Sequence, residues 1–348
     1  MGDVGVASIP DINSQHWNAA KYAFIKGEGG VALTYAHWLT NLIPDIEQLY
    51  FTGFYRINAK NTLSSSLRYL SLGRVYFTSI GGTSMGNFNL REFALDAGYS
   101  HSFSPYLSGG VVLRYIHSNP RAVPATGGGQ DYTAGTSVAG DLGIYYMKGV
   151  QLGEKMAQWA LGLNFSNLGT PVSYAEDQPG TPIPSNLRLG GRFSYEFNSE
   201  HSLSFHADIN KLLVPTPGIY MEDSLSGNLV LFRGKEAPGS VILGMFQSLY
   251  DAPGVPRPDG TYSVLAEEIH ELLFGLGTEY FYRKVFAIRS GYFHEHQTKG
   301  NRKYFTFGAG VRNRLLTFDL SYLLPVQGSS SPLYNTFRLA LTANFGGS

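Results

Sequence analysis

The chain of 348 residues contains no cysteine, and only 15% of its residues are charged. The lack of cysteine excludes disulfide bonds, thiol catalysis and thiolate metal sites. No apolar run approaches the roughly 20 residues of a membrane helix, so a membrane-spanning form of this chain has to be a barrel. Lys+Arg and Asp+Glu both number 26, which gives no reason to expect a nucleic-acid partner. The opening Met1-Gly2-Asp3 lacks the basic and apolar blocks of an export signal, which predicts a mature or trimmed form.

Aromatic residues and glycine are abundant instead, with 23 Tyr, 22 Phe and 42 Gly. Apolar and polar residues alternate strictly near the end of the chain, where Phe337 and Leu341 share one face and Arg338 lies on the other. A β-strand is the only regular structure that separates such sets. The same pattern predicts fourteen strands, near 29–38, 48–58, 62–72, 89–102, 105–118, 136–147, 156–168, 186–198, 201–211, 270–282, 285–294, 302–313, 315–324 and 335–346.

The connections between these segments alternate between short turns and longer loops, of which 212–269 is the longest. An even strand number with this alternation is typical of bacterial outer-membrane barrels. The sequence therefore predicts an all-β fold, a 14-stranded antiparallel transmembrane β-barrel over 29–348, in the outer membrane with both termini periplasmic. The alternative, a large soluble β-sandwich or propeller, has no reason to alternate its loop lengths.

Segment 239–250 fits either a fifteenth strand or a short helix. An odd strand would break the loop alternation, and Ser240 follows Pro238-Gly239 as a candidate helix cap, so we expect a helix within an external loop 212–269. The apolar residues of this segment have no lipid to face on the external side. They either pack on the barrel as a lid or bind another protein. The predicted partner-binding residues are Val241, Met245, Phe246, Leu249 and Tyr250.

Ionisable residues recur on the polar face of many predicted strands, which has to be the inner face because charge on the lipid face is costly. Both signs are present in similar numbers, so we expect a paired network in the lumen and no wide channel of one sign. A transport path is the alternative. The predicted lumen network consists of Arg188, Arg192, Glu196, Asp208, Glu279, Arg289, Arg312, Asp319 and Arg338. Residues 1–28 precede the first strand, and we expect them to fill the barrel mouth as a plug; the alternative is a periplasmic extension that stays outside.

The N-terminal region carries a recognisable series of short motifs. Its first eight residues read MGDVGVAS, and HWN and AKYAF follow at 16–18 and 20–24. Further on, GMFQS and DAPG occupy 244–248 and 251–254. With these motifs the whole chain resembles the PorV family of the type IX secretion system, which in turn resembles FadL-like barrels with fourteen strands and an N-terminal hatch. Ala19 departs from the pattern, where proline is expected; alanine there would loosen the hatch backbone.

The resemblance implies a non-enzymatic shuttle in the outer membrane. Such a protein binds the C-terminal signal domain of exported cargo at the translocon barrel and delivers the cargo to a sortase-like attachment complex. Outer-membrane lipid and lipopolysaccharide are the other expected contacts. The alternatives are a FadL-like transporter of hydrophobic small molecules, which needs its apolar site in the lumen, and a surface enzyme acting on lipid A.

Two motifs bear on that enzyme alternative and on metal binding. Gly82-Thr83-Ser84-Met85-Gly86 matches the hydrolase nucleophile elbow, but no helical pattern follows it, so we interpret it as external loop. His294-Glu295-His296 offers two histidines without a third ligand at readable spacing, which favours a polar loop rim. We therefore expect no catalytic residue, no metal and no cofactor.

Overall fold

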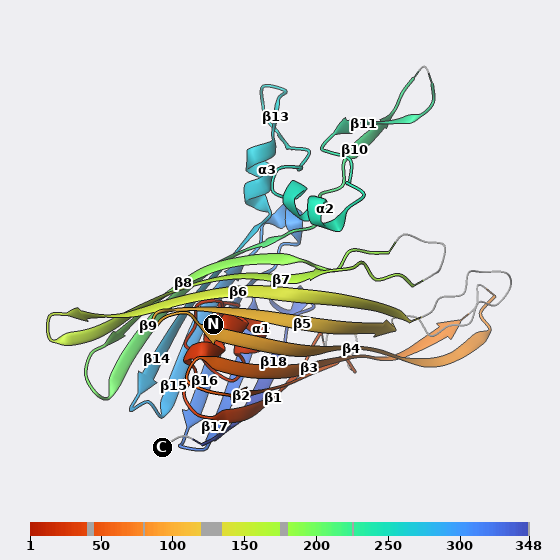
Figure 1. Cartoon of the computed structure of the whole chain (residues 1–348). Coiled ribbons are helices and arrows are strands. Elements are labelled where there is room, and N and C mark those ends of the chain that lie inside the picture. Colours follow the sequence, from red (N-terminus) through yellow and green to blue (C-terminus); the bar gives the residue numbers. More distant parts are fainter. Residues whose placement is uncertain (40–44, 79–80, 120–133, 175–179, 225, 347–348) are drawn as a thin grey trace.

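The computed structural model describes the chain except residues 40–44, 79–80, 120–133, 175–179, 225 and 347–348. Fourteen antiparallel strands form a closed barrel in which β1 pairs with β18, and β9 pairs with β14 across a long insertion (Figure 1). This confirms the predicted fold and strand number. The barrel strands are β1 (Gly29–His37), β2 (Glu47–Arg56), β3 (Asn61–Thr78), β4 (Ser84–Ser102), β5 (Leu107–Asn119), β6 (Gly135–Leu152), β7 (Lys155–Gly169), β8 (Asn186–Glu196), β9 (His201–Leu212), β14 (Leu272–Tyr282), β15 (Phe286–His294), β16 (Lys303–Arg312), β17 (Leu316–Pro325) and β18 (Thr336–Phe345).

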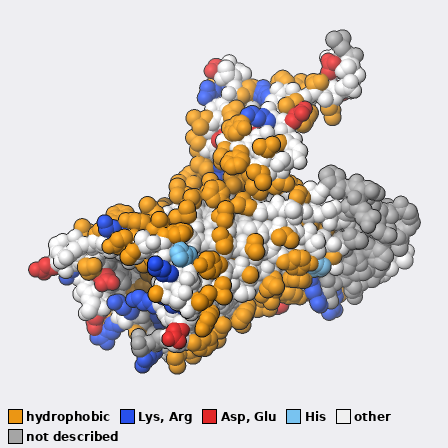
Figure 2. Space-filling model, viewed as in Figure 1, with side chains coloured by type: hydrophobic (Ala, Val, Ile, Leu, Met, Phe, Trp, Pro, Cys, Tyr) orange, Lys and Arg blue, Asp and Glu red, His pale blue; other side chains and the backbone are white. Residues whose placement is uncertain are grey.

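The alternation read from the sequence separates the two faces of the wall. In β18, Phe337 and Leu341 are exposed on the outer surface, whereas Thr336 and Thr342 are buried on the inner one. Figure 2 shows the resulting hydrophobic side chains spread over the outside of the barrel. Such a belt suits a wall that faces lipid.

Short turns join the strands at one end of the barrel, the short-turn end. Asparagine side chains stabilise three of these turns: the Oδ1 atoms of Asn58, Asn198 and Asn313 each accept backbone N–H bonds from residues two and three positions later. A fourth turn places Arg283 and Lys284 at φ values of 53° and 56°, the left-handed region that tight hairpins require. Local side-chain chemistry therefore closes this end with few residues.

Two hairpins extend further than the sequence predicted. Segment 73–88 was expected to be a loop, but β3 continues to Thr78 and β4 begins at Ser84. Gly73 lies at an irregularity of the ladder, with a φ of +78°, after which pairing resumes at Arg74. A bulge interrupts the period of two without ending the strand, and this explains the error. The β6–β7 hairpin is likewise longer and turns at Gly153, whose φ is +63°. Most of predicted loop 119–135 lies outside the described residues.

Residues 1–25 lie in the interior of the barrel (Figure 1). They contain the short helices α1 (Ser14–Trp17) and η1 (Ala19–Phe24). A β-carbon on Gly110 of β5 would lie 2.5 Å from the backbone nitrogen of Ala20, and one on Gly277 of β14 would lie 2.8 Å from the carbonyl oxygen of Met1. Inward-facing glycines thus make room for the N-terminal segment.

Residues 213–271 form a lobe beyond the barrel wall at the opposite end, here called the long-loop lobe (Figure 1). The expected helix in 239–250 is present, but Ser240 makes no side-chain cap hydrogen bond. No helix among the described residues is long and apolar enough to cross a membrane. The lobe contains β10 (Ile219–Glu222), β11 (Leu229–Arg233), α2 (Val241–Gln247), β12 (Val255–Pro256), β13 (Tyr262–Ser263) and α3 (Val264–His270), and the short helices η2 (Gln297–Lys299) and η3 (Gly328–Ser330) lie in other loops.

Candidate functional site

Two residues of the predicted lumen network bind the N-terminal segment through its backbone. The Asp208 carboxylate on β9 accepts hydrogen bonds from the backbone N–H groups of Gly5 and Val6, at 2.7 and 3.0 Å. Arg192 on β8 donates to the carbonyl oxygen of Ala7 at 3.2 Å. Backbone groups buried in a lumen need such partners, so these two charges fix the segment in place.

Two buried polar side chains of the segment find partners within the segment and on the barrel wall. Lys21 has no exposed surface, and its ammonium donates to the carbonyl oxygen of Gly5 at 3.0 Å and to Ser8 Oγ at 2.7 Å. The Asn18 amide donates to the carbonyl oxygen of Ile144 on β6 at 2.9 Å. An unpartnered charge at this depth would be costly, so the folded position of the segment is strongly specified.

Three further members of the predicted network form an ion cluster across neighbouring strands. Arg289 on β15 lies 2.6 Å from Glu279 of β14 and 2.5 Å from Asp319 of β17. On the other side of the lumen, Arg114 lies 2.7 Å from Asp96 and 2.9 Å from Asp141. Each of these two arginines has two carboxylate partners, and such pairing offsets the cost of taking the charges out of water.

The remaining predicted members do not join these clusters. Arg188 lies over the Trp17 ring, 5.1 Å from its centroid. Glu196, Arg312 and Arg338 are exposed. Alternation along a strand identifies the inward face, but it carries no information about height along the barrel, and residues near the rim meet water instead of partners.

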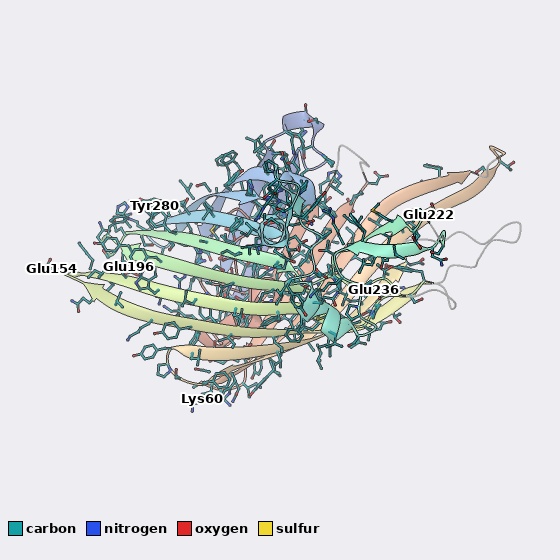
Figure 3. The ribbon with its side chains drawn as sticks, turned by 90° about the horizontal axis from the view of Figure 1, so that it is seen from above. Lys60, Glu154, Glu196, Glu222, Glu236 and Tyr280 are labelled. Atoms are coloured by element: carbon teal, nitrogen blue, oxygen red, sulfur yellow. The ribbon has the colours of Figure 1, made fainter. Side chains whose placement is uncertain are left out.

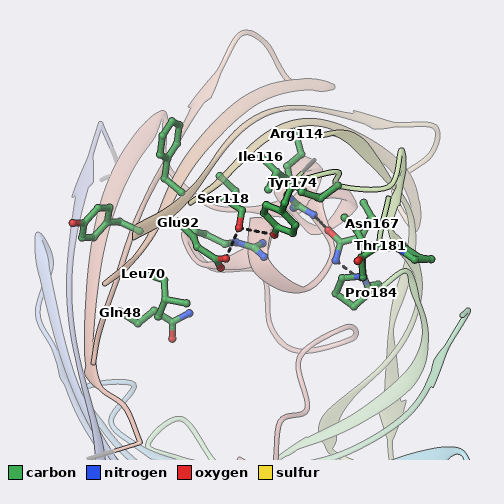
Figure 4. A pocket seen from close by; sticks show the side chains of 17 residues that line it. Gln48, Leu70, Glu92, Arg114, Ile116, Ser118, Asn167, Tyr174, Thr181 and Pro184 are labelled. Atoms are coloured by element: carbon green, nitrogen blue, oxygen red, sulfur yellow. Dashed lines mark hydrogen bonds between the residues drawn. The ribbon is translucent and has the colours of Figure 1, made fainter. Parts of the chain in front are cut away.

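A cavity of about 340 Å³ lies in the barrel between β2–β5 and residues 167–174 and 181–184 (Figure 4). Apolar residues such as Leu70 and Ile116 line part of it, and Arg114 and Glu92 contribute charge. Ser118 hydrogen-bonds both Glu92 and the Tyr174 hydroxyl across the cavity wall. The cavity is smaller than most drug-sized ligand sites but lies within their lower range.

A network of ion pairs connects the long-loop lobe to the barrel. Lys211, next to the end of β9, lies 2.8 Å from Glu268 and 2.7 Å from Glu271 of the α3 region. Lys299, in the β15–β16 loop, lies 2.8 Å from Glu267 and 2.9 Å from Glu271. Because strands from two parts of the barrel contribute, the lobe is fixed at two points.

The same glutamates organise the lobe internally. Glu267 accepts the backbone N–H of Gly254 at 2.6 Å, and Glu268 accepts that of Ala252 at 3.0 Å. Burial raises the pKa of Glu271, but hydrogen bonds from Lys211 and Lys299 outweigh burial and bring that pKa below its ordinary value. The ion pairs and hydrogen bonds of these glutamates therefore hold the chain segments of the lobe together.

Apolar side chains form exposed patches on this lobe, among polar and charged groups (Figure 2). In α2 the exposed fraction is 65% for Ile242 and Phe246 and 60% for Leu243, whereas Met245 is 9% exposed and packs inward. Among the other predicted partner-binding residues, Leu249 and Tyr250 are exposed and Val241 is partly buried. The helix thus presents a different face from the expected stripe, because its neighbours in the lobe cover Met245.

The two sequence motifs weighed for chemistry do not form a site. Ser84 starts strand β4 near the tip of the β3–β4 hairpin. His294 hydrogen-bonds Tyr292, Glu295 pairs with Arg302, and His296 stacks on His270 with ring centroids 3.6 Å apart. Among the described residues, no group of three or more His, Cys, Asp or Glu side chains is placed to hold a metal ion.

The sequence analysis did not predict the ion pairs that position the lobe. Their signal was the run Glu267, Glu268 and Glu271, whose spacing places two carboxylates on one side of a helix one turn apart. Their lysine partners lie 28 to 60 positions away in sequence. Long-range pairs of this kind leave no periodic trace.

The comparisons with known proteins identify the system in which this barrel works. A family model described as "Type IX secretion system protein PorV" matches residues 1–219 of the 348. The chain belongs to the PorV family. As a member it is a non-enzymatic outer-membrane β-barrel protein of the type IX secretion system. No curated protein matches the chain.

Solved structures show similarity of fold. The P. putida toluene transporter TodX has a TM-score of 0.50 at 11% identity, with 100% of this chain and 97% of that chain covered. The Ralstonia pickettii toluene transporter TbuX has 0.49 at 14% identity, covering 99% and 94%. A Pseudomonas aeruginosa FadL homologue has 0.41 at 11%, covering 98% and 96%. At 11% identity, the likeness to TodX concerns the fold alone.

Proposed function

We propose that this chain receives exported proteins at its long-loop end, holds their C-terminal signal domain and passes them to a sortase-like attachment complex. Family membership supports the secretion system. The single observation that favours a protein-binding role is the exposed apolar surface of the long-loop lobe. This lobe stands beyond the barrel wall (Figure 1), and exposed apolar patches mark interaction sites.

The proposal requires the long loops to face the cell exterior and the short turns to face the periplasm. Both ends of the barrel sequence, Gly29 and Phe345, then lie on the periplasmic side. The chain has no cysteine, which makes the orientation testable by single thiols. Lys60 lies in the short β2–β3 turn and Glu236 lies in the long-loop lobe; both are labelled in Figure 3. Glu236→Cys should react with an impermeant thiol reagent on intact cells, and Lys60→Cys only after permeabilisation; the reverse pattern contradicts the orientation.

The central experiment removes apolar character from α2 without touching buried Met245. Ile242→Ser, Leu243→Ser and Phe246→Ser together should leave the barrel folded, since all three side chains are exposed. Retention of a cargo signal domain and of the translocon barrel should fall at least tenfold, because apolar anchors dominate interface energies. The matched control is Ile242→Val, Leu243→Ile and Phe246→Leu, which keeps the surface apolar and should bind normally.

Heat-modifiable migration on gels verifies that both triple variants form the barrel. Normal binding of cargo and translocon by the folded serine variant would refute the partner surface and leave the lobe as a lid. Loss of binding in the conservative control as well would show that α2 shape, and not apolarity, is what matters.

The cavity favours a second candidate, transport of a hydrophobic small molecule. Its partly apolar lining is a possible ligand site in the lumen, although residues 1–25 occupy the barrel interior as well. Ala94 lines the cavity, and Ala94→Phe would fill it. If the chain is a transporter, this variant should lose uptake of the hydrophobic molecule. If it is the proposed shuttle, the variant should deliver cargo as the wild type does, and uptake should not change. Purification from the native membrane adds a second readout: a bound hydrophobic molecule without protein partners favours transport.

A further inference from the structure

Positively charged side chains are concentrated at the short-turn end of the barrel, although the formal net charge of the whole chain is zero. Among the described residues, four carboxylates lie at this end, at positions 28, 154, 196 and 200. We call the cations together the basic rim. It comprises Lys26, Lys60, Lys148, Lys155, Arg283, Lys284 and Arg314, which lie on the short turns or at the strand ends beside them. Figure 2 shows Lys and Arg side chains clustered at this end of the barrel.

Little of this charge is neutralised within the described residues. Arg283 pairs with Glu200 at 2.8 Å, and this is the rim's one ion pair there. Lys148 lies 5.8 Å from the centroid of the Tyr106 ring, and Arg283 lies 5.2 Å from that of Tyr282. Cation–π contacts keep the positive charge, so almost the whole rim presents free cations to its surroundings.

The cations border the apolar belt directly. Ile57, Phe103, Phe286 and Leu315 are exposed on the same turns or the strands next to them. Leu315, for example, immediately follows Arg314. Exposed apolar side chains mark the edge of the hydrocarbon region of a barrel, and the polar residues next to them stand at the level of lipid headgroups. Long lysine and arginine side chains reach that level readily.

We propose that the basic rim binds the phosphate groups of anionic glycerophospholipids, of the phosphatidylglycerol type, in the leaflet around the short turns. Its cations form a ring at the edge of the lipid belt, which fits a surrounding leaflet better than a single acidic protein segment. Anionic headgroups attract basic residues at a membrane surface, and the attraction adds up over several cations. The binding rests on the barrel alone and does not depend on the cargo-binding role.

The test uses the full chain in nanodiscs of equal acyl composition, with phosphatidylcholine alone or mixed with phosphatidylglycerol. Native mass spectrometry after release counts the lipids that the barrel retains. Wild type should retain phosphatidylglycerol several-fold above its share of the mixture, and added salt should weaken this enrichment. The variant Lys60→Gln, Lys284→Gln and Arg314→Gln changes exposed turn residues only, and its enrichment should fall to the level of the neutral lipid.

A matched control neutralises three cations at the other end, through Arg74→Gln, Arg91→Gln and Lys303→Gln, and should keep the enrichment. The proposal is overturned if wild type shows no enrichment, if the rim variant keeps it, or if the control variant loses it. A parallel arm with lipid A distinguishes the phosphate source. Binding of lipid A in preference to phosphatidylglycerol, lost in the rim variant, would assign the rim to the other lipid.

Discussion

Where the long-loop lobe meets the barrel, two cations are bound by carboxylates of the same chain: Lys211 and Lys299 reach three glutamates in and beside α3. At the short-turn end, Arg283 has a carboxylate partner and its neighbour Lys284 has none among the described residues. A lobe outside the lipid belt has to be held by its own contacts, so its charges are used internally. A rim at the membrane surface can leave its charges for the surroundings. The same residue types therefore serve architecture at one end and contact at the other.

Deletion of residues 1–25, which lie in the lumen between the two ends, should have the largest effect, a rise in ion conductance. The intact chain should conduct ions poorly, because residues 1–25 are buried in the lumen. A variant without these residues should conduct at a level closer to that of a water-filled porin. Planar-bilayer recordings measure this. Large steady conductance of the intact chain would show that the segment leaves an open path between the ends.

Glu271→Gln tests whether charge holds the lobe. The lowered pKa of this carboxyl means that its ionised form stabilises the folded lobe above the unfolded pKa of about 4.3. That contribution is lost as the pH falls through the folded pKa. The substitution should cost the lobe about 1 kcal/mol near neutral pH, since the site is only partly buried. Hydrogen exchange of residues 213–271 should rise on acidification in wild type and change less with pH in the variant.

Ala19→Pro should strengthen the segment between the two ends. Ala19 is the first residue of η1, where a proline fits because the first N–H groups of a helix lack intrahelical partners. Asn18 before it has extended backbone, with φ −165° and ψ 105°, as residues before proline prefer. We expect a gain of about 0.4–1 kcal/mol in the free energy of unfolding, measured by urea titration. A clear loss would show that η1 needs the backbone freedom of alanine.

Arg283→Gln should have the smallest effect. Its ion pair with Glu200 is exposed, with 59% and 43% of the side chains accessible. We expect a change in unfolding free energy of about 0.5 kcal/mol or less. The same urea titration measures it beside Glu271→Gln. If Arg283→Gln lowers the unfolding free energy as much as Glu271→Gln or more, the ion pairs at the two ends do not differ in their contribution to stability.

The candidate site was only partly predictable. Helix formation in 239–250 followed from its pattern, but the face it presents did not: Met245 is buried and Ile242 and Leu243 are exposed. A helix of seven residues gives too few turns to identify its buried side from sequence alone. The predicted strand 62–72 also stopped too early, because β3 continues through an irregularity at Gly73, and a bulge interrupts the period of two that identifies a strand.

By itself, the sequence determined the barrel: a period of two fixes which side chains face lipid and which face the lumen, and strand number and loop alternation follow from counting. The tertiary structure decided which charges meet. Asp208 meets Gly5 across 203 positions of the chain, and Lys211 meets Glu271 across 60. Alternation is a local property of the backbone, whereas these distances depend on closure of the whole barrel, which no local pattern encodes.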